Sequence, residues 1–259
     1  MDDGAFLGFV RDGLARLPGV RAVALGGSRA TGTHRPDSDW DFAIYYRTNF
    51  DPQHLRDLGW PGEVSEVGGW GGGVFNGGAW LLIDGRRVDV HYRDLDSIEH
   101  ELAESGQGRF RIEPLMFHLA GIPSYLVLAE LATNRVLSGE LPRPDYPAAL
   151  RGPAREVWWY RAERTFGYAL DYYVPIGRVS ECVGLIGQAA AQAAHAVLAA
   201  RGQWVTNDKR LLDLAGLRPL DEFVARAAAD RSVLGQVVGR SLALCAQALA
   251  ETGPAPAAS

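Results

Sequence analysis

The sequence has little lysine, little cysteine and no basic leader at its N-terminus. Of its 26 lysine and arginine residues only Lys209 is a lysine, and its two cysteines, Cys182 and Cys245, lie far apart without neighbouring histidines. That spacing argues against a zinc or redox motif and is typical of reduced core thiols. The N-terminus MDDGAFLGFV carries acids where a signal peptide needs basic residues. No uncharged apolar run reaches the roughly eighteen residues of a membrane span, so we expect a cytoplasmic protein without a membrane partner.

Clustered basic charge is also missing. The formal net charge is −5 at pH 7. A long polyanion is held mainly through clustered lysine and arginine side chains. We therefore expect a small ligand rather than a long nucleic acid. A negatively charged chain also suits a small ligand that is cationic.

The chain of 259 residues, 47% of them hydrophobic, is long enough for one large domain or two modest ones. Strand patterns come first, at 20–25 and 40–46 and in a hairpin of 79–83 and 88–92 around Asp84-Gly85. Helical patterns then dominate, at 155–173, 178–202, 208–217 and 221–250. This order predicts an α+β fold, with an N-terminal mixed β-sheet and flanking helices followed by a C-terminal helical bundle.

The expected domains are 1–145, a helical domain over 146–250 and a disordered tail over 251–259. Residues 145–154, which contain DYP and RGPA, are typical of a linker. The segment 68–78 has seven glycines in eleven residues. It is either a lid near the site or a poorly ordered connection.

The most informative stretch is GGSRATGTHRPDSDWD, residues 26–41. Asp39 and Asp41 are two residues apart, so on a strand both carboxylates point to one face. Asp89 lies on the later hairpin strand. Three converging carboxylates repel one another unless a cation lies between them, and Mg²⁺ prefers such oxygen ligands. The glycines before them let backbone N–H groups approach phosphates closely.

The order Gly27-Ser28, Asp39-x-Asp41 and a later acid on a hairpin strand resembles the nucleotidyltransferase superfamily typified by DNA polymerase β. Within it, the kanamycin and other aminoglycoside nucleotidyltransferases are similar in having a helical domain after the catalytic one. The resemblance covers about residues 20–92 in its motifs and the helical half only in general pattern.

The resemblance implies transfer of a nucleoside monophosphate from a nucleoside triphosphate, with ATP the expected donor and pyrophosphate the by-product. It implies that Asp39, Asp41 and Asp89 are catalytic and bind two Mg²⁺ ions, and that Gly27 and Ser28 hold the triphosphate. Asp89 is expected to act as metal ligand, general base or both. Glutamates of the later part of the chain are alternative bases: Glu113, Glu163 and Glu181.

Two further residues are candidates for the nucleotide site. Arg29, near the start of a short helix, is placed to reach phosphates or to pair with an acid. Lys209 begins a helix after WVTND, at a place that resembles the phosphate-contacting lysine of related two-domain enzymes; otherwise it is an exposed surface lysine. His34 and His91 lie closer to the acids, but neither has a second histidine at metal-ligand spacing.

The acceptor is expected to be a small hydroxylated molecule such as an aminoglycoside-like antibiotic. The alternatives are nucleotidylation of a protein hydroxyl, or a non-catalytic, antitoxin-like or regulatory module with the same fold. The helical half is where a homodimer would be expected to form.

Overall fold

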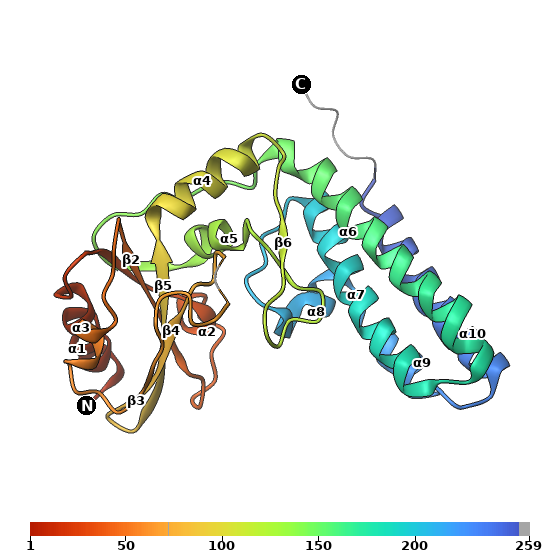
Figure 1. Ribbon diagram of the computed structural model, residues 1–259, viewed down its shortest axis with the longest axis horizontal. Helices are drawn as coiled ribbons and strands as arrows, with labels where there is room; N and C mark the ends of the chain where they lie inside the picture. Colours follow the sequence, from red (N-terminus) through yellow and green to blue (C-terminus); the bar gives the residue numbers. More distant parts are fainter. Residues whose placement is uncertain (72, 254–259) are drawn as a thin grey trace. The chain divides into compact units, whose positions relative to one another are not determined.

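The computed structural model describes residues 1–71 and 73–253 and divides them into two compact units (Figure 1). The first unit comprises Met1–Ala103 and Ser124–Asp145; the second begins with Glu104–Pro123 and continues from Tyr146. The segment 104–123 therefore groups with the helical unit although it precedes residue 146. Most of the tail expected at 251–259 lies, from residue 254 on, outside the described residues.

The first unit contains a six-stranded mixed sheet. In spatial order the strands are β3 (Gly62–Val64), β4 (Gly78–Ile83), β5 (Arg86–Asp94), β2 (Trp40–Tyr46), β1 (Val20–Leu25) and β8 (Arg135–Ser138). Neighbouring strands are antiparallel except for β2 and β5, which are parallel. The predicted α+β class, with an N-terminal sheet followed by a helical region, is confirmed.

One face of this sheet forms the hydrophobic core of the unit. Helix α1 (Asp3–Ala15) buries Phe6, Val10 and Leu14, which recur at helical spacing. Alternate residues of the central strands meet them from the sheet: Trp40, Phe42, Ile44 and Tyr46 of β2, and Val88, Val90 and Tyr92 of β5. Because side chains alternate along a strand, the residues between these point to the opposite face.

The opposite face is covered at one end by α5 (Leu126–Thr133). Arg93 of β5 donates to both carboxylate oxygens of Glu130, at 2.6 and 2.7 Å. Asn134, just after α5, donates to the hydroxyl of Tyr45 at 3.0 Å. Tyr45 and Arg93 are register partners. Asp41 and Asp89 form another register pair of β2 and β5 on this face, further from α5.

Short helices complete the first unit: α2 (Gly27–Ala30), α3 (Gln53–Arg56) and the first part of α4 (Leu95–Gly106). The second unit pairs β6 (Ile112–Glu113) with β7 (Ile122–Pro123) and is otherwise helical. Its longer helices are α6 (Ala148–Tyr168), α7 (Val179–Arg201) and α10 (Arg231–Ala250), and its shorter ones are α8 (Leu211–Ala215) and α9 (Leu220–Val224). Helices α6 and α7 pack against each other.

Two expectations about this helical region were wrong. Residues 148–154 are not a linker, because α6 begins at Ala148 and buries Leu150 and Ala154, with Pro153 inside the helix. The range 221–250 is not one helix, because Asp230 ends the intervening turn and accepts a hydrogen bond from the Val233 N–H at 2.9 Å as the N-cap of α10.

Helices α7 and α10 are long and apolar enough to cross a membrane by length and composition alone. The most apolar window of α7 is 72% buried inside the structure and that of α10 is 39% buried. The burial of α7 is that of a core helix in a packed bundle.

Candidate active site

Asp41 and Asp89 lie side by side on the face of the sheet that is opposite the hydrophobic core. They are direct register partners of the parallel strands β2 and β5, which places their side chains on the same face. One carboxylate oxygen of each and one ring nitrogen of His91 all lie within 4.8 Å of one another, and all three residues are half-buried. Two carboxylates and an imidazole at this spacing form a donor set that suits a divalent cation.

His91 is the member of this group that the sequence analysis did not assign. It follows Asp89 by two residues on β5 and so shares its face, a signal that was present in the sequence. Burial, reinforced by the charge of Arg93, lowers the pKa of His91 to about 4. The neutral imidazole that results is the form that binds metals. Its Nδ1 atom is buried and has no hydrogen-bond partner among the described residues.

The turn after β1 brings the backbone against Asp41. The Gly26 N–H donates to the Asp41 carbonyl at 2.7 Å, and Gly27 follows with φ of +59°. A Cβ atom on residue 27 would overlap the Oδ2 atom of Asp41. Any other residue at this position would have a strained backbone conformation and would displace the Asp41 carboxylate. Ser28 lies in the first turn of α2 beside it.

Asp39 lies just before β2 rather than on it. Its Oδ1 atom accepts from the Arg87 Nε at 2.5 Å, while the Arg87 Nη2 donates to the Asp37 carbonyl at 3.3 Å. Among residues 1–71 and 73–253, Asp39 is not a member of the group that could hold a metal together with Asp41 and Asp89. The structure thus brings two of the three predicted acids together and leaves the third in an ion pair.

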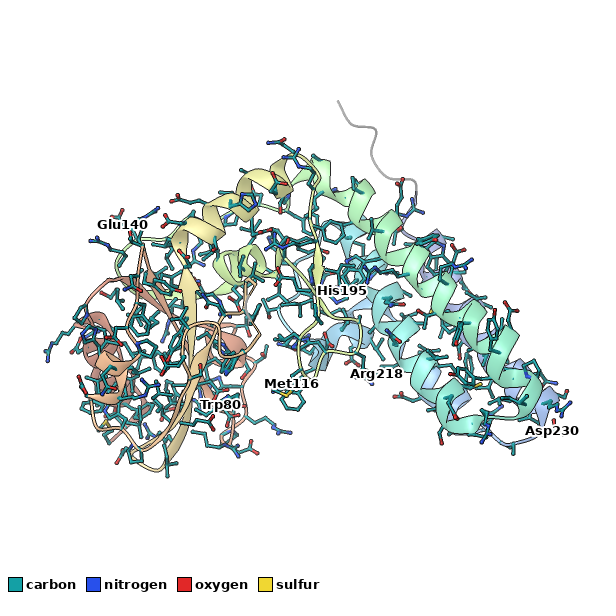
Figure 2. All side chains as sticks on the ribbon, in the orientation of Figure 1. Trp80, Met116, Glu140, His195, Arg218 and Asp230 are labelled. Carbon is teal, nitrogen blue, oxygen red and sulfur yellow. The ribbon has the colours of Figure 1, made fainter. Side chains whose placement is uncertain are left out.

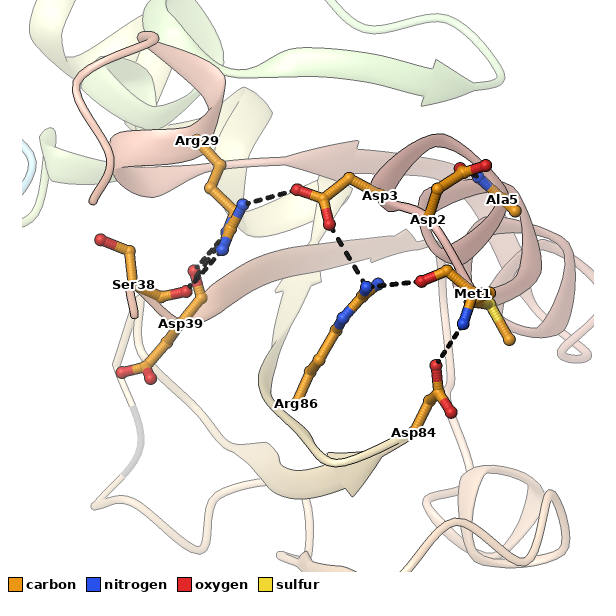
Figure 3. A network of polar contacts seen from close by, with 9 residues as sticks. All are labelled: Met1, Asp2, Asp3, Ala5, Arg29, Ser38, Asp39, Asp84 and Arg86. Atoms are coloured by element: carbon orange, nitrogen blue, oxygen red, sulfur yellow. Dashed lines mark hydrogen bonds and ion pairs between the residues drawn. The ribbon is translucent and has the colours of Figure 1, made fainter. Parts of the chain in front are cut away.

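Arg29 supports the loop that leads to the acids. Its guanidinium donates to the carbonyls of Ser38 and Asp39 at 2.9 to 3.2 Å, pairs with the Asp3 carboxylate at 3.4 Å and lies 4.0 Å from the centre of the Trp40 ring. The side chain is only 8% exposed. Figure 3 shows the contacts of Arg29 with Ser38, Asp39 and Asp3, with the Asp39 carboxylate directed away from Arg29. These contacts are those of an arginine that fixes the backbone of residues 38 and 39.

An aromatic surface lies next to the acids. Trp80 of β4 is the register partner of Asp89, so the two share a face, and Trp80 is 41% exposed (Figure 2). The ring of Trp70, from the glycine-rich segment, stacks on Trp80 with centroids 5.0 Å apart and stands edge-on to His91 at 5.8 Å. The glycine-rich segment therefore contributes a side chain beside the candidate site.

Lys209 belongs to the second unit, in the short 3₁₀ turn Asp208–Arg210, where it is exposed. The Asn207 side chain caps this turn by accepting from the Lys209 N–H at 3.0 Å. The neighbouring Asp208 lies 3.3 Å from the Nδ1 atom of His118, which joins the turn to the segment 104–123.

Comparisons with known proteins bear on this geometry. A search of curated protein sequences finds no match. Among solved structures, a nucleotidyltransferase-like protein from Exiguobacterium sibiricum 255-15 is similar with a TM-score of 0.41 and 8% identity, over 96% of this chain and 77% of that one. Residues 9–71 match the model of a family described as "Nucleotidyltransferase domain"; they include Gly27, Ser28, Asp39 and Asp41 and end before Asp89. This match identifies a nucleotidyltransferase-type domain in the N-terminal part of the chain, over residues 9–71.

Proposed function

We propose that the protein is an Mg²⁺-dependent nucleotidyltransferase that transfers a nucleoside monophosphate, with ATP as the donor, to a hydroxyl group of a small acceptor. The observation that carries the proposal is the pairing of Asp41 with Asp89 across two parallel strands, directly beside the Gly26-Gly27-Ser28 turn. A phosphate-sized turn and a pair of carboxylates are the two parts that metal-dependent transfer from a triphosphate requires.

The donor set fits a divalent ion. Asp41, Asp89 and His91 offer two oxygens and one nitrogen within 4.8 Å of one another, and the buried His91 Nδ1 has no partner among the described residues. When bound, Mg²⁺ would supply a Lewis acid that neutralises charge on the phosphoryl oxygens. Asp39 lies close by in sequence and joins this set in the proposal, as a ligand of a site for two ions.

The remaining steps fall to groups of the chain. The backbone of Gly27 and the hydroxyl of Ser28 orient the triphosphate, with Lys209 as a further phosphate contact. Asp89 accepts the proton of the acceptor hydroxyl as that oxygen bonds to the α-phosphorus. The bond from the α-phosphorus to the pyrophosphate oxygen breaks, and pyrophosphate leaves.

The acceptor in this proposal is a small hydroxylated molecule, and an aminoglycoside-like antibiotic is the first class to test. The formal charge of −5 supports a small ligand over a long nucleic acid. The reaction is proposed to take place in the cytoplasm, where Mg²⁺ and nucleoside triphosphates are both available.

Calorimetric titration tests the donor site first. Non-hydrolysable analogues of ATP, GTP, CTP and UTP are added to the purified protein with and without Mg²⁺. We expect Mg²⁺-dependent binding with a preference for the ATP analogue, and its loss in Asp41→Asn and Asp89→Asn. The matched control is Asp84→Asn, on the same hairpin, where the carboxylate pairs with the N-terminal amine instead.

Acceptors are then screened by pyrophosphate release. Release with a small hydroxylated compound supports the proposal, and release only with a protein acceptor corrects its substrate class. Failure of the wild type to bind any nucleotide in the presence of Mg²⁺ would contradict the proposal and favour a non-catalytic role for the fold.

A further inference from the structure

Arg87 forms an ion pair with Asp39, one of the predicted metal ligands. The guanidinium of Arg87 lies at the start of β5, two residues before Asp89, and its Nε donates to Asp39 Oδ1 at 2.5 Å. The Arg87 side chain is 70% exposed and that of Asp39 is 38% exposed. A pair this open to solvent contributes little to stability, so it exchanges readily for other partners.

The two neighbouring arginines are held much more firmly. Arg29 is almost buried and donates to two backbone carbonyls. Arg86 donates to the Met1 carbonyl at 2.7 Å and pairs with Asp3 at 3.3 Å, with a side chain 25% exposed (Figure 3). Both therefore have structural partners that a ligand would have to break, whereas Arg87 depends mainly on Asp39.

These arginines line one side of a hollow of about 630 Å³ in the first unit. Its wall includes Arg29, Arg86 and Arg87 together with Asp39 and Trp40. The hollow is large enough for a small-molecule group, and its wall contains Asp39, the residue to which the proposed function adds a metal ion.

We infer that Arg87 is a substrate-binding residue that exchanges partners: it holds Asp39 before divalent ions bind, and then binds an anionic group of the substrate in this hollow. The inference rests on the proposed function, because it requires Asp39 to take a metal ion. A cation on Asp39 removes the partner of Arg87 and repels its guanidinium. A phosphate or carboxylate is the group that a guanidinium fork binds best.

The exchange of partners predicts that removal of the Arg87 guanidinium changes two affinities in opposite directions. Arg87 competes with metal ions for Asp39, so Arg87→Gln should bind Mn²⁺ about two- to fivefold more tightly in the absence of nucleotide, the range expected for removal of an exposed ion pair. The same variant should bind the anionic ligand about tenfold or more weakly, because a charge-assisted hydrogen bond is lost. A purely structural role for Arg87 would not produce opposite signs.

Electron paramagnetic resonance of Mn²⁺ measures the first affinity on the full chain. Arg87→Lys keeps the positive charge but loses the forked guanidinium group. Its affinity for Mn²⁺ should therefore stay close to that of the wild type, and its affinity for the anionic ligand should be lower. The matched control is Arg35→Gln, which removes another exposed arginine, 82% exposed and 3.3 Å from Asp37. It should bind both ligands as the wild type does.

The second affinity distinguishes the two sources of the anion. If Arg87→Gln binds the ATP analogue more weakly than the wild type does in the presence of Mn²⁺, the triphosphate is the partner of Arg87. If that affinity is unchanged, inorganic phosphate and acetate are titrated into protein saturated with Mn²⁺ and the analogue, and weaker binding of either identifies an anionic group on the acceptor.

Two results would overturn the inference. If Arg87→Gln binds Mn²⁺ and all these anions as the wild type does, the exchange is wrong while the proposed function stands. If the wild type binds neither Mn²⁺ nor the nucleotide analogue, the proposed function fails and the exchange fails with it.

Discussion

The backbone of Gly27 lies so close to the carboxylate of Asp41 that any side chain at position 27 would overlap its Oδ2 atom. The phosphate-sized turn and the first carboxylate of the candidate site are therefore one structural unit. Because Asp41 is in turn the register partner of Asp89, a displacement of the Asp41 carboxylate by a side chain at residue 27 changes the geometry of the pair of acids.

Gly27→Ala should therefore impair ligand binding more than stability. The positive φ of +59° costs about 1 kcal/mol for alanine, and the overlap additionally forces Asp41 out of place. Displacement of a reacting group by about 1 Å can cost about a hundredfold in rate. We expect calorimetry to show at least a tenfold loss of affinity for the nucleotide in the presence of Mg²⁺. Urea unfolding should show a loss of only about 1 kcal/mol in stability.

Gly32→Ala is the control for this variant. Gly32 has a similar φ of +70°, but a Cβ there would meet nothing within 4 Å. It should lose the same stability and retain nucleotide binding. Equal binding losses in both variants would mean that backbone strain, rather than contact with Asp41, is the cause.

His91→Gln should change metal preference. Imidazole suits Zn²⁺ better than Mg²⁺, which prefers oxygen ligands, so loss of the ring nitrogen affects the two ions unequally. We expect Zn²⁺ to bind at least about tenfold more weakly, the lower end of the effect known for supporting partners of metal ligands, and Mg²⁺ to change less. Competition titrations with a metal indicator measure both.

His100→Gln serves as the matched control, since His100 is exposed on α4. A His91→Gln variant with unchanged affinity for both ions would remove His91 from the donor set.

The sequence predicted the strands of the site well, because local signals determine them. The strands 20–25 and 40–46 have the predicted bounds, since each is an apolar run that ends at glycine or polar residues. The hairpin around Asp84-Gly85 formed as its turn residues indicated. The class of the fold followed from the order of these elements.

The arrangement of the acids depends on contacts between distant segments, which a single sequence does not contain. Asp39 and Asp41 were expected on one strand, but β2 begins at Trp40, and Arg87 from the hairpin pairs with Asp39. The sequence has no second histidine at metal-ligand spacing from His91, so it does not predict His91 as a ligand. The partners of His91 are instead Asp89, two residues earlier, and Asp41, reached through the parallel register.

Glu130→Ala should destabilise the first unit strongly. Arg93 is 1% exposed and is held by both oxygens of Glu130, so removal of the carboxylate leaves a buried, uncompensated charge. Such a loss costs about 3–5 kcal/mol. Urea unfolding followed by circular dichroism measures it.

Glu99→Ala provides the comparison, because its pair with Arg47 is exposed on both sides. It should change the unfolding free energy only slightly. A small effect of Glu130→Ala would show that solvent or another acid compensates Arg93.

His195 should make stability depend on pH in the second unit. The ring is 3% exposed, stacks on Trp158 with centroids 4.4 Å apart and has an Nε2 atom with no hydrogen-bond partner among the described residues. Burial lowers the pKa of His195 from 6.5 to about 4, opposed by the nearby Asp208 and reinforced by His118. The folded protein therefore holds the ring neutral where the unfolded chain binds a proton.

The sign follows from this difference in proton binding. Stability from His195 is fully present above pH 6.5 and is lost as the pH falls toward 4, by about 3 kcal/mol at most. His195→Leu removes the titration, so its unfolding free energy should fall less between pH 7 and pH 4.5 than that of the wild type. The comparison of the two slopes cancels the carboxylates that titrate in both proteins. Parallel slopes would show that the unfolded and folded states protonate His195 alike, which its burial against Trp158 argues against.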